Sequence, residues 1–487
     1  MMRTFSLSAT EPFFDLIPRY PHAIKTLFHI VQMPFITLFG YSPFSLRLIS
    51  LTAGFAGLYF FYRLLKGYFK DPVPAGICIL LMLDIQFIYA SRFARQEIIL
   101  FTALIIALLL FQHGSISGER SRFRLAAMVI GISIGFHPNS FLIALPLGAF
   151  YCVRFLLERD KSSFRDLCEY TGILLLFALF FVGISLIMDP AFLSHYAAAG
   201  ERLEVGVPLY IKFFRFPDFY LKLFYGISGT YYTPDIRLQF FLFAAVSAVS
   251  LPIAVLRAER RGLIVSLLTA LVFLNLGTLV LGKYSQPSII FHFPLYYMLL
   301  ASLIDAVPGH LFGISTPLKK IILSILAGLL LISSGVNIMK EMHLLPPKNA
   351  TSFESYREYS RNIRSFVPAD ATVLANLNSL YAFDFGRLRD YRNLTYLGDA
   401  GLDFGEYIEL NGIEYIIYPE EMDFIYRRRP VWNILYGNVA GYYEEMKEYL
   451  EEECNAAGSF SSPSYGMRIT RYSGTRPWKV TVYRVKR

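Results

Sequence analysis

Ten stretches of this sequence are apolar over roughly the length of a membrane-spanning helix, and they restrict the fold more than any other feature. A bilayer's hydrocarbon core, about 30 Å thick, is crossed by about 20 apolar residues in a helix. With 55% hydrophobic and only 17% charged residues, the chain is also too apolar for an ordinary soluble protein. We therefore expect an α-helical polytopic membrane domain whose spans lie near residues 44–66, 73–91, 97–113, 124–138, 140–157, 169–188, 238–256, 262–281, 287–306 and 319–338.

The fourth and fifth apolar stretches are short, and only the turn His137-Pro138-Asn139 separates them. They form either one kinked helix or a hairpin of two spans. Their outer flanks, 118–124 and 153–165, are both basic, and cytoplasmic loops of membrane proteins are enriched in Lys and Arg. Only a hairpin leaves both basic flanks in the cytoplasm, so we predict the hairpin.

This orientation divides the chain into three parts. An outer N-terminal segment (1–43) with an interfacial helix precedes a transmembrane domain (44–338) with a long outer loop at 189–237, and residues 339–487 form an outer soluble domain. The predicted location is the cell membrane, with the C-terminal domain on the outer, or periplasmic, side. The net charge of +9 does not indicate nucleic-acid binding, because the basic residues fall in short clusters between apolar runs.

The composition changes after residue 340, where charged residues return and apolar residues alternate. Thr351 and Glu354 have the spacing of a capping box at the start of a helix, and a second helix is expected near 440–452. Strands are expected at 371–376, 413–419 and 478–485. The sequence thus predicts a C-terminal extramembrane α/β domain. It has no nucleophile-elbow, zinc-protease or phosphate-loop signature, which favours acceptor binding or a scaffold role over catalysis.

The short segment SRFARQE (91–97) places Arg92, Arg95 and Glu97 between two apolar runs, on the predicted outer side. A charge at the centre of a spanning helix costs about 2.5–3.5 kcal/mol and less near the interface, so a partner or a purpose is expected. In one interpretation the arginines extend to lipid headgroups and Glu97 caps the next helix. In the other, the forked guanidinium of Arg95 holds a lipid phosphate, with Arg92 beside it, and Glu97 orients Arg95.

The segment before the first span combines charge and apolar surface in a similar way. His22 and Lys25 precede an apolar helix that Pro34 interrupts, and the sequence LFG (38–40) and Arg47 lead into the first span. Isolated His and Lys side chains at an interface are mostly solvated, but together with Arg95 these groups form a candidate phosphate site.

Two other outer segments contribute supporting candidates. His137 lies in the predicted hairpin turn, and Tyr231 and Tyr232 lie in the 189–237 loop. That loop mixes aromatic residues with balanced charge, so it either rests along the outer interface or forms a lid over a site at the membrane surface.

Two segments, YPHAIKTLFHIVQMPFITLFGYSPFSLRLIS (20–50) and FIYASRFARQEIILFTALIIALLLF (87–111), together resemble the integral-membrane glycosyltransferases of the GT-C type. These include the protein O-mannosyltransferases of glycosyltransferase family 39 and the aminoarabinose transferases that act on lipid A. In that family a segment with His or Lys is followed by LFG and by an arginine that opens the next span. A later arginine-containing segment ends in Asp or Glu. The residues that match this order are His22, Lys25, Arg47, Arg92, Arg95 and Glu97.

The resemblance implies an inverting glycosyltransferase that moves a sugar from a polyprenyl-phosphate donor to an acceptor hydroxyl on the outer face of the membrane. A carboxylate takes the proton of the acceptor, and Arg or Lys stabilises the departing lipid phosphate. Because cationic side chains can neutralise this phosphate, no cofactor is required, although a divalent metal is not excluded. The expected partners are a polyprenyl-phosphate sugar, membrane lipids, and a protein, lipid or glycan acceptor.

The catalytic carboxylate is where this chain departs from the family. In relatives it lies well before the His/Lys segment, and here only Glu11 and Asp15 are available. Three alternatives follow: one of these two is the base, the base lies upstream of Met1, or the protein is not catalytic.

Two other classes of function compete with the glycosyltransferase. The chain could bind a lipid-linked sugar without transferring it, as a transporter or flippase-associated protein, or it could be a structural membrane subunit. Common transporter folds show internal repeats with helices broken at matching places, and the sequence shows no such repeat, which favours the enzyme.

Overall fold

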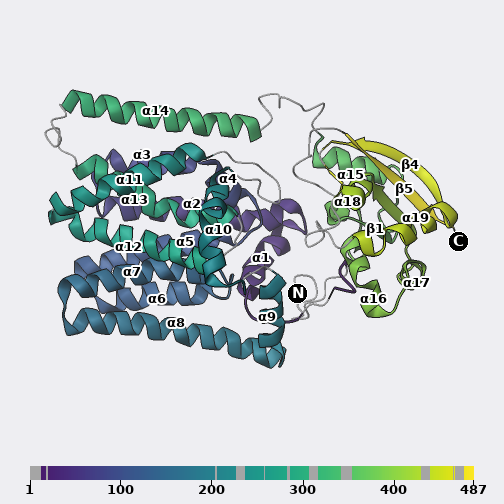
Figure 1. Ribbon diagram of the computed structural model, residues 1–487, viewed down its shortest axis with the longest axis horizontal. Coiled ribbons are helices and arrows are strands. Elements are labelled where there is room, and N and C mark those ends of the chain that lie inside the picture. Colours follow the sequence, from purple (N-terminus) through teal and green to yellow (C-terminus); the bar gives the residue numbers. More distant parts are fainter. Residues whose placement is uncertain are drawn as a thin grey trace. The chain divides into compact units, whose positions relative to one another are not determined.

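The computed structural model describes residues 13–17, 20–202, 206–225, 236–256, 258–281, 286–306, 316–341, 354–428, 439–463, 465–466 and 477–486 (Figure 1). The chain divides into two compact units. The membrane unit comprises Met1–Ser6 and Tyr20–Met342, and the C-terminal unit comprises Leu7–Arg19 and His343–Arg487.

The secondary structure of the membrane unit is helical in its described part. Its elements, in chain order, are α1 (Thr26–Phe39), α2 (Pro43–Lys66), α3 (Val73–Met82), α4 (Ile85–Arg92), α5 (Glu97–Ser117), α6 (Arg120–Ser133), α7 (Ser140–Glu158), α8 (Lys161–Met188), α9 (Phe192–Arg202), α10 (Leu209–Tyr225), α11 (Arg237–Leu256), α12 (Ala258–Leu281), the 3₁₀ helix η1 (Gln286–Phe291), α13 (Phe293–Ala306) and α14 (Thr316–Glu341).

Among the described residues, seven helices are long and apolar enough to cross a membrane, or eight if the pair α3 and α4, bent by 65°, is one span. These eight coincide with eight of the ten predicted spans. The predicted span 124–138 falls on α6, which has only 14 residues. The predicted span 319–338 falls on α14, where the qualifying apolar stretch in the described part is Gly328–Met339. Of the about ten predicted spans, eight are borne out by length and composition within the described residues.

The predicted hairpin at His137 is confirmed. The Tyr151 hydroxyl near the end of α7 donates to the backbone oxygen of Phe123 near the start of α6 (2.8 Å), so the two helices run antiparallel. Figure 1 shows α6, α7 and α8 side by side. Two prolines inside apolar helices, Pro34 in α1 and Pro146 in α7, do not end those helices.

The loops predicted to be cytoplasmic meet at one end of the helices. Arg120 and Arg154 both bind Asp166, at 3.0 Å each, which ties α6, α7 and α8 together. Arg260, in the first turn of α12, donates to the backbone oxygen of Tyr68 (2.9 Å) and pairs with Asp305 at the end of α13. Positive charge that the sequence placed on one side is thus neutralised by acidic groups of neighbouring helices.

Close helix packing at the opposite end depends on small residues of α2. A Cβ at Gly57 would lie 2.8 Å from the Thr102 hydroxyl oxygen of α5, which leaves no room for a larger side chain. The Thr102 hydroxyl is within hydrogen-bond distance (2.8 Å) of the backbone oxygen of Ala53 on α2. This contact fixes the start of α5, where the charged turn 91–97 joins it.

The C-terminal unit contains a five-stranded sheet in the order β2-β1-β3-β5-β4, parallel between β2, β1 and β3 and antiparallel beyond. Its elements are α15 (Tyr356–Arg364), β1 (Val373–Ala375), η3 (Leu377–Ala382), β2 (Leu388–Asp390), η4 (Tyr391–Tyr396), α16 (Leu397–Ala400), α17 (Phe404–Leu410), β3 (Tyr415–Pro419), α18 (Glu421–Arg428), η6 (Val439–Gly441), α19 (Tyr443–Glu452), β4 (Cys454–Ser462) and β5 (Trp478–Val485).

The three predicted strands of this unit are confirmed as β1, β3 and β5, and the predicted helix near 440–452 is α19. The capping box was wrong by four residues, because Ser355 and Glu358 form it at the start of α15. Glu354 is instead buried, where its carboxylate accepts from the Asn362 amide and the Ser462 hydroxyl. Thr351 lies outside the described residues.

Candidate functional site

Arg95 and Glu97 form a bidentate ion pair at the junction of α4 and α5. Arg95 Nε donates to Glu97 Oε2 at 3.0 Å, and Arg95 Nη2 donates to Oε1 at 2.6 Å. The Glu97 side chain is only 3% exposed, whereas that of Arg95 is 32% exposed. A buried carboxylate therefore fixes the orientation of a guanidinium that reaches the surface.

Lys25 belongs to the same cluster of charges. It precedes α1 with φ of 80°, a left-handed conformation that is uncommon outside glycine. Its ammonium group interacts electrostatically with both Glu97 and Arg95. Burial lowers the pKa of Lys25, and Glu97 opposes this shift while Arg95 adds to it. A bound anion would relieve the repulsion between the two cations.

His137 completes the cluster from the turn between α6 and α7. The backbone N–H of Asn139 donates to His137 Nδ1 at 3.0 Å, so a neutral His137 carries its proton on Nε2. The imidazole interacts electrostatically with Lys25, Glu97 and Arg95. The ring can therefore act as a neutral hydrogen-bond donor beside the two cations.

Backbone contacts bring the three segments together. The backbone N–H of Leu27 donates to the oxygen of Gly135 at 3.0 Å, which joins the start of α1 to the α6–α7 turn. The Ser50 hydroxyl of α2 donates to the backbone oxygen of Arg95 at 3.1 Å. Residues distant in the sequence thus surround one carboxylate, Glu97.

His22 lies at the edge of this cluster, together with a histidine that the sequence interpretation missed. Burial lowers the pKa of His22, and the charge of Lys25 and a smaller effect of His29 lower it further. Among the described residues no group forms a hydrogen bond with His22 Nδ1, which is buried. His29 lies in α1, whereas His22 and Lys25 precede that helix, so the spacing of these residues in the sequence was no signal for His29.

The other predicted site residues lie apart from the cluster or outside the description. Arg92, the last residue of α4, is exposed. The Arg47 guanidinium lies 5.7 Å from the ring centroid of Phe93, beside the charged turn. Glu11, Tyr231 and Tyr232 lie outside the described residues. Among the described residues, no three His, Cys, Asp or Glu side chains gather as metal ligands would.

Asp15 belongs to the C-terminal unit. Its carboxylate accepts from the Tyr407 hydroxyl at 2.9 Å and lies 3.8 Å from Arg389 Nε. The neighbouring backbone is fixed by Asn393, whose amide donates to Phe13 O (2.9 Å) and accepts from Leu16 N–H (3.3 Å). Residues 13–17 therefore form part of the C-terminal unit, which sequence order alone did not indicate.

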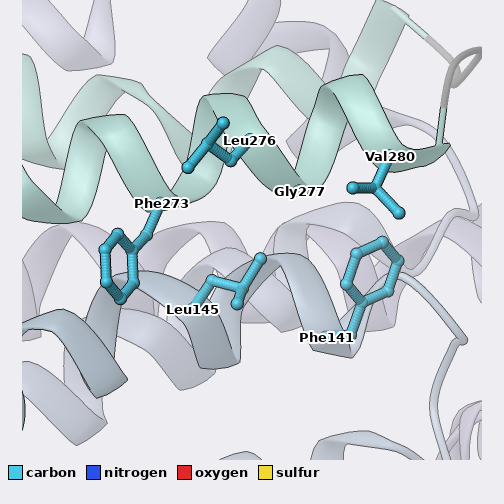
Figure 2. Close-up of a pocket in the computed structure, with 6 residues that line it drawn as sticks. All are labelled: Phe141, Leu145, Phe273, Leu276, Gly277 and Val280. Atoms are coloured by element: carbon cyan, nitrogen blue, oxygen red, sulfur yellow. The ribbon is translucent and has the colours of Figure 1, made fainter. Parts of the chain in front are cut away.

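An apolar groove lies between α7 and α12 (Figure 2). Phe141 and Leu145 line it from α7, and Phe273, Leu276, Gly277 and Val280 line it from α12. Phe141 follows the His137 turn by four residues, so one end of the groove lies close to that turn in the chain. Its lining is suited to a hydrocarbon chain and not to the polar part of a reaction.

The helical membrane unit followed by a C-terminal α/β unit has a fold similar to that of the GT-C-type glycosyltransferase ArnT. ArnT from Cupriavidus metallidurans in the apo state shares the fold, with a TM-score of 0.57 and 13% identity, over 96% of this chain and 89% of that chain. The same protein bound to undecaprenyl phosphate gives a TM-score of 0.55 and 12% identity, over 95% and 88%. At these identities the likeness concerns the fold.

The family is indicated by the sequence. Residues 27–185 match the family model of the dolichyl-phosphate-mannose-protein mannosyltransferases, and the match begins two residues after Lys25 and includes Arg95, Glu97 and His137. No curated protein sequence matches the chain. The family-model match and the shared fold support the predicted resemblance to the GT-C-type membrane glycosyltransferases, and they confirm the fold class and a multi-pass membrane location.

Proposed function

We propose that this protein transfers a sugar from a polyprenyl-phosphate donor to an acceptor hydroxyl on the outer face of the membrane, with inversion at the anomeric carbon. The observation that carries the proposal is the arrangement of Lys25, Arg95 and His137 around the buried carboxylate of Glu97. In this proposal the C-terminal unit lies on the outer side of the membrane, the same side as this cluster, because the distribution of basic residues assigns the cytoplasmic side to the opposite ends of the spans.

The cluster has the groups that a phosphate requires. Arg95 offers a planar fork, Lys25 a compact charge, and His137 a neutral donor, while Glu97 holds Arg95 in one orientation. These groups stabilise the negative charge that develops on the lipid phosphate as the bond to the sugar breaks. Arg92 and His22 lie nearby in the chain and, as predicted from the sequence, would assist donor binding, with Arg47 supporting the turn.

The lipid chain of the donor requires an apolar surface within the membrane. The groove between α7 and α12 offers such a surface, lined by apolar side chains and by Gly277. ArnT from C. metallidurans, which shares the fold, has been solved with undecaprenyl phosphate bound. We therefore take undecaprenyl phosphate as the probe of the donor site.

Glu11 and Asp15 remain the carboxylates that the family resemblance offers as the base. The Asp15 carboxylate accepts from the Tyr407 hydroxyl and lies close to Arg389, contacts that fix its position.

The proposal is tested with the full-length protein in lipid nanodiscs. The probes are undecaprenyl-phosphate mannose and undecaprenyl-phosphate glucose, with a membrane extract as the acceptor, and mass spectrometry follows the release of undecaprenyl phosphate. We expect the protein to release undecaprenyl phosphate. The Lys25→Ala variant should release none, whereas Arg122→Ala, at the opposite end of the membrane unit, should release it at the unaltered rate. Binding of either donor without release would support the alternative, a protein that binds a lipid-linked sugar without transferring it. Absence of binding would contradict both functions.

A further inference from the structure

A second polar constellation, which the phosphate cluster does not use, lies between α8 and α9. Asp189 follows the last residue of α8, and its Oδ2 lies 2.7 Å from His195 Nδ1 on α9. The other carboxylate oxygen, Oδ1, accepts from the backbone N–H of Ala191 at 3.0 Å, so the carboxylate is fixed at both oxygens. The side chains of Asp189 and His195 are 11% and 29% exposed.

This arrangement determines which nitrogen of His195 is basic. A carboxylate that accepts from Nδ1 keeps the proton there and leaves the lone pair on Nε2. Among the described residues, no group forms a hydrogen bond with Nε2. The ring of Tyr20 stacks on the imidazole with centroids 3.3 Å apart and an angle of 11°, so the orientation of the ring is fixed as well. Of the described titratable side chains, Asp189 and Tyr20 are those in contact with His195.

The pair is connected to the phosphate cluster by a short segment of the same unit. Tyr20, which contacts His195, precedes Lys25 by five residues, so their Cα atoms are at most about 17 Å apart. The backbone N–H of Ala23 donates to the Ser185 hydroxyl of α8 at 2.9 Å, and the rings of His22 and Phe192 are 6.1 Å apart. The lysine side chain, a phosphate and one sugar ring together span much of this separation between Lys25 and His195's neighbour Tyr20.

We propose that His195, oriented by Asp189, is the general base that activates the acceptor hydroxyl. The acceptor oxygen forms a bond to the anomeric carbon, and the bond between that carbon and the phosphate oxygen breaks, with its electron pair remaining on the phosphate. The hydroxyl proton passes to His195 Nε2, and the imidazolium is stabilised by Asp189. This proposal rests on the proposed function and assigns the proton to the membrane unit, in place of Glu11 or Asp15.

The first experiment measures whether a bound sugar covers His195. The purified protein is treated with diethylpyrocarbonate, and mass spectrometry gives the modification rate of each histidine. We expect undecaprenyl-phosphate mannose to slow modification of His195, and undecaprenyl phosphate alone to slow it much less. The matched control is His113, an exposed residue near the opposite end of α5, whose rate should not change. Donor binding without any protection of His195 overturns the base assignment alone, whereas absence of donor binding overturns the proposed function and the base together.

The second experiment measures the role of the ring in transfer. We expect His195→Ala to lower turnover by about 10²- to 10⁴-fold with little change in the KM for the donor, and imidazole in the buffer to restore part of it. Asp189→Asn should lower turnover and shift its pH profile, because the tautomer of His195 is no longer fixed. A purely structural role predicts a loss that imidazole does not restore. Turnover that survives His195→Ala but not Asp15→Asn assigns the base to Asp15 and overturns the proposal.

Discussion

Replacement of Arg95 tests the proposed phosphate site most directly. Arg95→Ala removes a guanidinium that makes hydrogen bonds of 3.0 and 2.6 Å to Glu97 and would share the lipid phosphate with Lys25. Hydrogen bonds to charged groups contribute about 1.5–3 kcal/mol each. Loss of two such bonds to the phosphate corresponds to about 3 kcal/mol, or roughly 100-fold weaker binding of the lipid.

The substitution has a second effect, because it leaves Glu97 without this partner. The Glu97 side chain is 3% exposed, and removing one member of a buried ion pair costs about 3–5 kcal/mol of stability. The remaining carboxylate also repels a phosphate. We therefore expect the double variant Arg95→Ala/Glu97→Gln to bind undecaprenyl phosphate more tightly, and to unfold at a higher temperature, than Arg95→Ala alone.

The assay is native mass spectrometry of the detergent-extracted protein titrated with undecaprenyl phosphate, with thermal unfolding measured in parallel. Arg122→Ala is the matched control, because this arginine is also exposed and lies at the opposite end of the membrane unit. We expect it to bind within about threefold of the unaltered protein, a difference of less than 1 kcal/mol. If Arg95→Ala binds equally well, the ion pair is structural and the reasoning fails.

Three other predictions concern separate parts of the molecule. Because burial lowers the pKa of Lys25, its ammonium loses its proton at a lower pH than an ordinary lysine, so affinity for undecaprenyl phosphate should fall as pH rises from 8 to 10. Lys25→Arg should flatten this pH dependence, because arginine stays charged; equal slopes for the two proteins would contradict the prediction. Val280→Trp, at an exposed position lining the groove, should narrow it and weaken binding of undecaprenyl phosphate about tenfold but not of geranyl phosphate, whereas Val255→Trp, exposed on α11 away from the groove, should change neither. Asn393→Ala should lower the stability of the C-terminal unit by about 2–3 kcal/mol and speed proteolysis next to residues 13–17, and unchanged proteolysis would show that Asn393 does not hold this segment.

The spans show what hydropathy predicts well. Eight of the predicted spans appear because each contains a continuous apolar run, a local property that requires no knowledge of neighbouring helices. The basic flanks of α6 and α7 also predicted their hairpin, because charge in the wrong compartment is costly. The count of spans was less accurate, since an apolar run such as α6 can be too short to cross alone.

The C-terminal unit shows where local patterns lose their information. Strands β1, β3 and β5 were predicted because their residues alternate or are continuously apolar. Strand β4 was missed because CNAAGSFSS has few apolar residues, and its pairing with β5 supplies the hydrogen bonds that define it. The capping box was misplaced by four residues because two Ser/Thr and Glu pairs have the same spacing, and only the structure shows that Glu354 is buried.

The sequence by itself determined that this chain spans a membrane, which basic loops lie together, and that Lys25, Arg95 and Glu97 are unusual for their surroundings. These properties follow from hydrophobic length and from the cost of charge, both of which act locally. Only the tertiary structure decided that Lys25 and His137 lie within electrostatic reach of the Arg95–Glu97 pair, that Asp15 belongs to the C-terminal unit, and that Asp189 orients His195. Such contacts join residues far apart in the chain, and their energies depend on helix packing that no local pattern records.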